Sequence, residues 1–157
     1  LTAFGVDLLY EGLVLEIDGM AMLGNKRRIV TATSADWIGA SGFPHAWQAG
    51  AEIYLGGHAA PGGAGLQAQT EASIERLRST LEEAGGELGH LVKATIFYVD
   101  GRDDPTGARG QETVLRVLAD YLPSPGPALT MVRVPGLPHE GQLMAIDGIA
   151  RLDAIQD

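Results

Sequence analysis

The sequence predicts an α+β fold, in which two helices lie on one face of a mixed β-sheet and an extra N-terminal hairpin comes from a preceding repeat. Residues 66–84 and 114–121 have apolar side chains at helical spacing, as helices with one buried side do. Shorter segments with alternating or β-branched apolar residues lie before, between and after them. The last of these segments occurs twice in the chain, which predicts the repeat.

The repeat relates residues 11–23 to residues 140–152. The offset is 129 positions, about the length of a small domain, and seven of the thirteen aligned residues are identical. We therefore expect residues 1–26 to be the end of a preceding unit, residues 27–157 to be one complete unit, and the chain to be part of a tandem protein. Chance similarity between two alternating apolar strands is the alternative.

The strands of the first third follow from alternation and from turn residues. The N-terminal hairpin would use Thr2–Leu8 and Gly12–Leu23, where apolar residues recur at every second position. The complete unit would begin with a short β-branched strand at Ile29–Thr33. His45–Gln48 and Glu52–Leu55 would form a second hairpin around a glycine turn.

The helices and the remaining strands are marked by their ends. Leu66–Ala84 has the most regular helical pattern, and the glycines at 85 and 86 end it. The second helix would start after the acidic residues and proline of 103–105. The remaining predicted strands are Leu91–Val99, Ala128–Val134 and Gln142–Leu152.

Composition excludes several kinds of protein. The net charge is −9, and the only dense basic cluster is Lys26-Arg27-Arg28, so we expect no nucleic-acid partner. No apolar run approaches the roughly 20 residues of a membrane span, so we expect no membrane partner either. The four histidines have no metal-ligand spacing, and no metal site is predicted. The absence of cysteine allows a reducing compartment, and we expect a cytoplasmic protein.

Several short motifs together resemble the Rid family, the YjgF-type reactive-intermediate deaminases. The first is Ala49-Gly-Ala-Glu-Ile-Tyr-Leu-Gly-Gly-His58. The others follow in the family's order at Gln69–Ile74, Leu81–Gly85, Leu91–Asp100, Pro127–Thr130 and Ile146–Ala150. The resemblance covers residues 27 to 152.

This resemblance implies a chorismate-mutase-like fold and small-molecule pockets in the clefts between subunits of a trimer. For this chain, we expect a homotrimer or a pseudo-trimer of tandem units. Family members hydrolyse enamines and imines to keto acids and ammonia without a metal or an organic cofactor. An arginine clamps the substrate carboxylate, and a glutamate positions water or moves protons.

The chain departs from the family pattern at both of these residues. The position of the arginine is occupied by Leu129, which cannot hold a carboxylate, and the position of the glutamate by Ala145, which cannot carry a proton. In the N-terminal copy, Glu16 stands at the position corresponding to Ala145. Glu16 is therefore either a catalytic carboxylate of the preceding unit or an exposed strand residue without a role.

The remaining candidate residues follow from family position. His45, His58 and Asp147, together with Glu16, are the catalytic candidates, since histidine and carboxyl groups transfer protons. Each of these three also has a structural interpretation: His45 as a histidine satisfied at a subunit boundary, His58 as a loop histidine, and Asp147 as a strand-end hydrogen-bond partner. The predicted substrate-binding residues are Gly56, Gly57, Gln111, Leu129 and Met131.

Three functions remain open from the sequence. The first is an enzyme with a diverged pocket that hydrolyses, tautomerises or rearranges an imine, an enamine or a related carbonyl intermediate, in a specialised biosynthetic or catabolic pathway. The second is a subunit without catalysis that binds a ligand or supports assembly. The third is the ribonuclease activity ascribed to some members of the family, which the acidic composition disfavours.

Overall fold

The computed structural model describes residues 2–5, 12, 15–31, 42–60, 65–100 and 108–152. The helices are α2 (Leu66–Ala84) and α3 (Ala108–Tyr121), with a short 3₁₀ helix η1 (Leu88–His90). The strands are β1 (Arg27–Ile29), β2 (Ala46–Ala49), β3 (Glu52–His58), β4 (Leu91–Tyr98), β5 (Ala128–Arg133) and β6 (Met144–Arg151). The predicted start of the second helix and part of the predicted strand Ile29–Thr33 lie outside the described residues.

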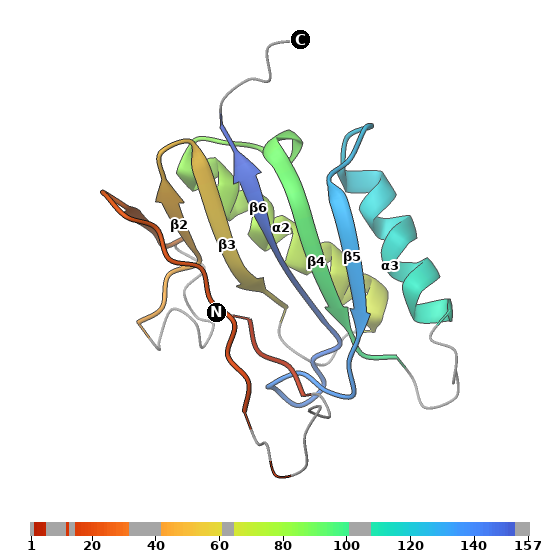
Figure 1. The fold of residues 1–157 in the computed structure, drawn as a ribbon. Coiled ribbons are helices and arrows are strands. Elements are labelled where there is room, and N and C mark those ends of the chain that lie inside the picture. Colours follow the sequence, from red (N-terminus) through yellow and green to blue (C-terminus); the bar gives the residue numbers. More distant parts are fainter. Residues whose placement is uncertain are drawn as a thin grey trace.

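The six strands form one mixed sheet in the order β1-β2-β3-β6-β4-β5. Only β4 and β5 pair in parallel, and α3 is the crossover that joins them. Both helices lie on the same face of this sheet (Figure 1), so the predicted α+β class is confirmed. The last strand, β6, is central and pairs antiparallel with both β3 and β4.

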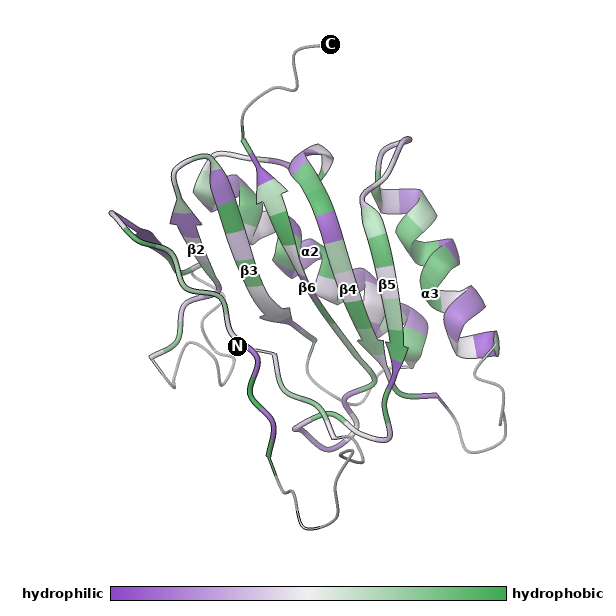
Figure 2. Ribbon diagram, in the orientation of Figure 1, coloured by the Kyte–Doolittle hydropathy of each residue, from purple (hydrophilic) through white to green (hydrophobic). Residues whose placement is uncertain are grey.

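Helix α2 supplies much of the core because its apolar residues recur at helical spacing. Ile74, Leu77 and Leu81 are fully buried against the sheet. Gly85 ends the helix in the left-handed conformation, with φ of 88°, and its N–H binds the carbonyl of Glu82. In Figure 2, hydrophilic and hydrophobic residues alternate along the helices and strands, as expected for elements with one buried side.

Gln69 on α2 holds the turn that leads into β6. Its side chain is 1% exposed, and its Nε2 donates to the Gly141 carbonyl at 2.8 Å. Its Oε1 accepts from the Leu143 N–H, also at 2.8 Å. The amide thus replaces backbone partners that the turn lacks and fixes the position at which β6 begins.

The N-terminal hairpin is not confirmed. Residues 15–23 have no strand structure, and residues 6–11, 13 and 14 lie outside the described residues. Gly5 forms one isolated bridge with Gly136. The alternating apolar side chains of residues 15–23 are exposed, and each described strand of the sheet pairs within residues 27–151. Alternation alone cannot form a strand where no neighbouring strand is offered.

Candidate functional site

The sheet separates the predicted site residues, because its two faces have different surroundings. One face packs against α2 and α3 and forms the main core with them. The N-terminal segment, by which we mean the described residues before β1 (2–5, 12 and 15–26), crosses the other face, which we call the open face (Figure 1). Along β6, Met144 and Ile146 point to the helices, whereas Ala145 and Asp147 point to the open face.

Asp147 stands on the open face of the central strand. Its Cα pairs with that of Thr95 on β4, so the two side chains are neighbours, and Thr2 Oγ1 donates to Asp147 Oδ2 at 2.8 Å. Burial raises the pKa of the Asp147 carboxyl, while hydrogen bonds from Thr2 and Thr95 and the charge of Lys93 act in the opposite direction. Asp147 therefore keeps its proton to a higher pH than an ordinary aspartate.

An apolar cluster adjoins this carboxyl group. Its buried members are Phe97, Val134 and Ala145, which we call the open-face cluster. Ala145 pairs with Phe97 across β4 and β6 and is 4% exposed. The methyl group at the family's glutamate position is thus packed against an aromatic ring, two residues before Asp147.

The N-terminal segment covers part of the open face. The Phe4 ring stacks on Phe97, with 4.4 Å between ring centroids and 22° between ring planes. Further along the segment, Met22 Sδ lies 3.6 Å from the Tyr54 hydroxyl oxygen. The same hydroxyl contacts Glu52 Oε2 at 2.5 Å, and this hydrogen bond raises the pKa of Tyr54. Most side chains of the segment remain exposed, so this cover is loose.

The two predicted catalytic histidines lie away from Asp147, buried on the helix side of the sheet. Their ring centroids are 6.1 Å apart. His58 Nε2 lies 2.8 Å from the Thr80 hydroxyl on α2, and His58 Nδ1 lies 2.7 Å from the Gly56 carbonyl. His45 Nδ1 accepts the Thr31 N–H at 3.2 Å. These contacts hold β3 to α2 and tie His45 to Thr31, two residues after the end of β1.

The predicted glycines explain why His58 points inward. The pairing of β3 with β6 shifts between Leu55 and His58, and Gly56 and Gly57 occupy this irregularity. In a regular strand, Leu55 and Gly57 would share the helix face and His58 would face the open side. The shift turns His58 to the helix side, where it meets Thr80.

The remaining predicted residues are dispersed. Gln111 is exposed on α3, and Glu16 is exposed in the N-terminal segment. Leu129 and Met131 lie on the edge strand β5, where Leu129 is 40% exposed and Met131 packs against the main core. The structure therefore brings His45 and His58 together on one face and leaves Asp147 on the other. The catalytic and binding roles of all these residues remain predictions.

Sequence reasoning missed the neighbours of Asp147. Lys93, Thr95 and Phe97 alternate along β4 and share the open face. Their period of two was visible in the sequence, but their placement beside Asp147 depends on the pairing of β4 with β6. Thr2 lies 145 residues away in sequence and gave no local signal.

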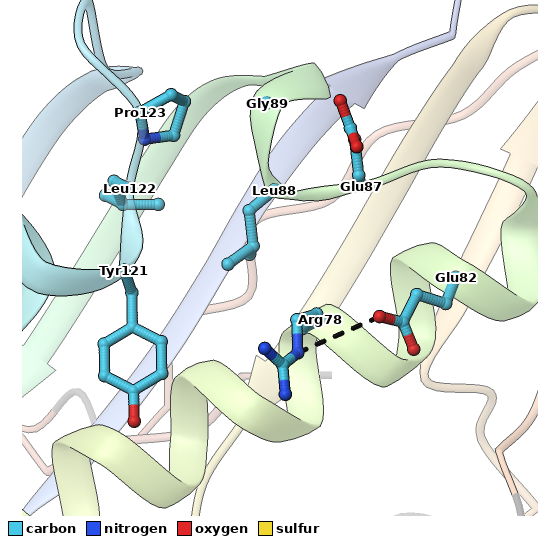
Figure 3. Close-up of a pocket in the computed structure, with 8 residues that line it drawn as sticks. All are labelled: Arg78, Glu82, Glu87, Leu88, Gly89, Tyr121, Leu122 and Pro123. Atoms are coloured by element: carbon cyan, nitrogen blue, oxygen red, sulfur yellow. Dashed lines mark ion pairs between the residues drawn. The ribbon is translucent and has the colours of Figure 1, made fainter.

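A hollow of about 420 Å³ lies on the helix side, between the end of α2, η1 and the end of α3. Figure 3 shows Arg78 and Glu82 on its α2 wall, with their ion pair dashed, opposite Tyr121 and Pro123. Arg78 and Glu82 are exposed, as is Arg78's other ion-pair partner, Glu75. The hollow contains none of the predicted site residues.

The described residues contain neither a membrane-spanning helix nor a metal-binding group. No helix among them has the length and apolar character to cross a membrane. Across the same part of the chain, no three or more histidine, aspartate or glutamate residues are grouped in a way that could hold a metal ion.

A six-stranded mixed sheet with two helices on one face and an open opposite face defines the YjgF/Rid class of α+β domains. Residues 38–152 match the family model described as Ribonuc_L-PSP, Endoribonuclease L-PSP. The chain belongs to this family.

Solved structures of the class show the same fold. Rv2704 of Mycobacterium tuberculosis, a member of the YjgF/YER057c/UK114 family, has a TM-score of 0.69 at 24% identity, over 81% of this chain and 99% of that chain. The yeast protein YEO7 has a TM-score of 0.68 at 22% identity, over 82% and 100%. RidA from the Antarctic bacterium Psychrobacter sp. has a TM-score of 0.66 at 25% identity, over 80% and 99%. No curated protein matches the sequence.

Proposed function

We propose that this chain transfers a proton to or from a small imine, enamine or related carbonyl compound on its open face, with Asp147 as the acid–base group. The Rid family is generally associated with imine and enamine deamination, which supplies the reaction class. The observation that carries the proposal is the partly buried Asp147 carboxyl, whose pKa burial raises. A carboxyl group with a raised pKa works as an acid and as a base closer to neutral pH.

In imine hydrolysis, the Asp147 carboxyl would protonate the nitrogen as water adds to the carbon, and the carboxylate would recover a proton from that water. The resulting carbinolamine then loses ammonia and leaves a carbonyl compound. The hydroxyl groups of Thr95 and Thr2 hold the carboxyl in place. In tautomerisation, the same group would move a proton between nitrogen and carbon without water.

The ligand we propose is apolar and without a carboxylate. Leu129 at the family's arginine position removes the bidentate carboxylate clamp. Ala145 and Phe97 next to Asp147 favour an aliphatic or aromatic substituent. The chain's net charge of −9 also disfavours anionic ligands, RNA included.

The assembly we propose is a trimer, formed by copies of this chain or by tandem units, in which a neighbour closes the open face. Several apolar side chains on or beside the sheet remain accessible in the single chain, among them Trp47 and Val92. A neighbouring unit that covered them would also enclose Asp147 and separate the reacting group from bulk solvent.

The test compares two substrates and two variants. The whole chain is mixed with an aliphatic ketimine that has no carboxylate, and separately with the imine of pyruvate, and carbonyl formation is followed against buffer alone. We expect faster turnover of the ketimine, and a loss of about 10²-fold or more in Asp147→Asn. Asp18→Asn, the exposed counterpart in the repeat, is the matched control and should keep full activity. Equal rates for the wild type and Asp147→Asn would contradict the proposal.

A subunit without turnover, which binds a ligand or supports assembly, is the second candidate, and one observation disfavours catalysis at Asp147. Thr2 and Phe4 of the same chain already contact Asp147 and Phe97, where a ligand would sit. Calorimetry with the ketimine's stable amine analogue separates the two functions. Binding without any acceleration over buffer would support the second.

A further inference from the structure

The N-terminal segment presents an unusual surface. Leu15 is 68% exposed and Ile17 is 82% exposed, and Met20 and Leu23 are also largely accessible. Contiguous exposed apolar side chains in a soluble domain mark a surface that another molecule covers. Leu15 and Ile17 stand two positions apart, as side chains on one face of a strand do, although residues 15–23 form no strand in this structure.

The equivalent residues of β6 show the packing environment that this pattern suits. On the helix face of β6, Met144, Ile146 and Ala150 are fully buried in the main core. Gly148 shares this face and has no room for a side chain. A Cβ there would lie within 3.0 Å of the Lys93 carbonyl oxygen on β4, closer than real Cβ atoms come to such a neighbour. The central strand therefore needs three apolar residues and one glycine at alternate positions.

Residues 15–21 meet all four requirements. Leu15, Ile17, Gly19 and Ala21 stand at the positions of those four residues, and the last three are identical to their counterparts. In this chain nothing demands a glycine at position 19, because a Cβ there would meet no atom within 4 Å and its φ is not positive. The glycine is therefore explained by a packed environment that the described residues of this chain do not supply.

The open face of the copy differs where packing leaves freedom. Asp18 keeps the place of Asp147, whereas Glu16 replaces Ala145. Alternation would place the Glu16 and Asp18 side chains on the same face, two residues apart. The copy thus retains the apolar character of the helix face of β6 and differs on the open face at Glu16.

We propose that residues 15–23 belong to the central strand of a second unit of this fold, between strands equivalent to β3 and β4. In the described unit every other element precedes β6 in the sequence. The rest of the second unit would therefore come from polypeptide N-terminal to residue 11. A second copy of this chain fits less well, because its own β6 already fills the place between β3 and β4.

A chimera tests whether the segment can take this place. Residues 27–139 are fused directly before residue 11 of the chain, so that residues 11–23 follow them as β6 normally does. In the matched control chimera, residues 140–152 replace residues 11–23. Both products retain a complete unit downstream, whose folding serves as the internal standard.

We expect both chimeras to show two folded units. Backbone amides of residues 15–22 should exchange with solvent rapidly in the unfused chain and on the order of 1,000-fold more slowly in the first chimera. Gly19→Val should unfold the added unit of that chimera but leave the unfused chain unchanged. A folded control beside an unfolded test unit would overturn the proposal. Protection that appears in the unfused chain as its concentration rises would also overturn it, since a second copy would then be the partner. These outcomes do not depend on catalysis.

Discussion

Replacing Gln69 with leucine should destabilise the domain through the turn that leads into β6. Leucine has a similar volume, so the cavity term is small, but two hydrogen bonds of 2.8 Å disappear, one to the Gly141 carbonyl and one from the Leu143 N–H. A buried partner left unsatisfied costs about 1–3 kcal/mol. Gly141 is exposed, so water can replace the bond to its carbonyl, whereas Leu143 is partly buried. We therefore expect a loss of about 2 kcal/mol, mostly from the Leu143 N–H.

Urea unfolding followed by far-ultraviolet circular dichroism measures this loss. Gln67→Leu is the matched control, because Gln67 is exposed on the same helix and its amide forms solvent-exposed hydrogen bonds with Glu71 and Arg116. The control should change stability by no more than about 0.5 kcal/mol. A loss of about 2 kcal/mol lowers Tm by roughly 4–8 °C in a chain of this length. If Gln69→Leu unfolds at the same urea concentration as Gln67→Leu, the bonds to the turn do not stabilise the fold.

Three further predictions concern the open face and the central strand. Burial raises the folded-state pKa of Asp147, so the contribution of this group to the free energy of unfolding depends on pH. The contribution is fully present below the unfolded pKa of about 3.9 and is lost as pH rises through the folded-state pKa. Asp147→Asn should therefore show a smaller fall in urea midpoint between pH 4 and pH 7 than the wild type, and an identical slope would contradict the assignment. Gly148→Ala should destabilise by about 2 kcal/mol or more, because a backbone carbonyl must move, whereas Gly19→Ala should leave thermal unfolding of this chain unchanged. Phe4→Ala removes the ring that stacks on Phe97 at 4.4 Å and should lower the free energy that holds the N-terminal segment in place by about 1 kcal/mol. Hydrogen exchange at the Gly5 amide should then become faster. An unchanged exchange rate would show that the stack does not hold the segment.

The fold was predictable wherever a local pattern and its environment agree. Ile74, Leu77 and Leu81 follow the helical period, and Gly85 ends the helix in the left-handed conformation for which glycine is suited. Residues 15–23 carry an equally clear strand pattern and form no strand in this structure. A strand exists only through its neighbours, so sequence periodicity predicts the capacity to pair and cannot supply the partner.

The candidate site was less predictable, because side-chain direction depends on register. His58 follows Leu55 at a spacing that points it to the open face, and the irregularity at Gly56 and Gly57 reverses that direction. Asp147 was identified by its position in the last strand, but Thr95 became its neighbour only through the pairing of β4 with β6. A register shift of one residue turns the side chains of a strand to the opposite face of the sheet. Site residues predicted from sequence can therefore lie on different faces unless the register of every strand is known.

The two copies of the last strand separate packing from chemistry. Ile146, Gly148 and Ala150 recur unchanged as Ile17, Gly19 and Ala21, because the helix face of a central strand tolerates little else. On the open face the two copies differ, because Glu16 takes the position of Ala145 and Met22 takes the position of Arg151. If both strands belong to the same kind of sheet, the second unit has a pair of carboxyl groups where this unit has one carboxyl beside a methyl group. The two faces would then suit different substrates, the more polar of the two belonging to the unit that contains Glu16.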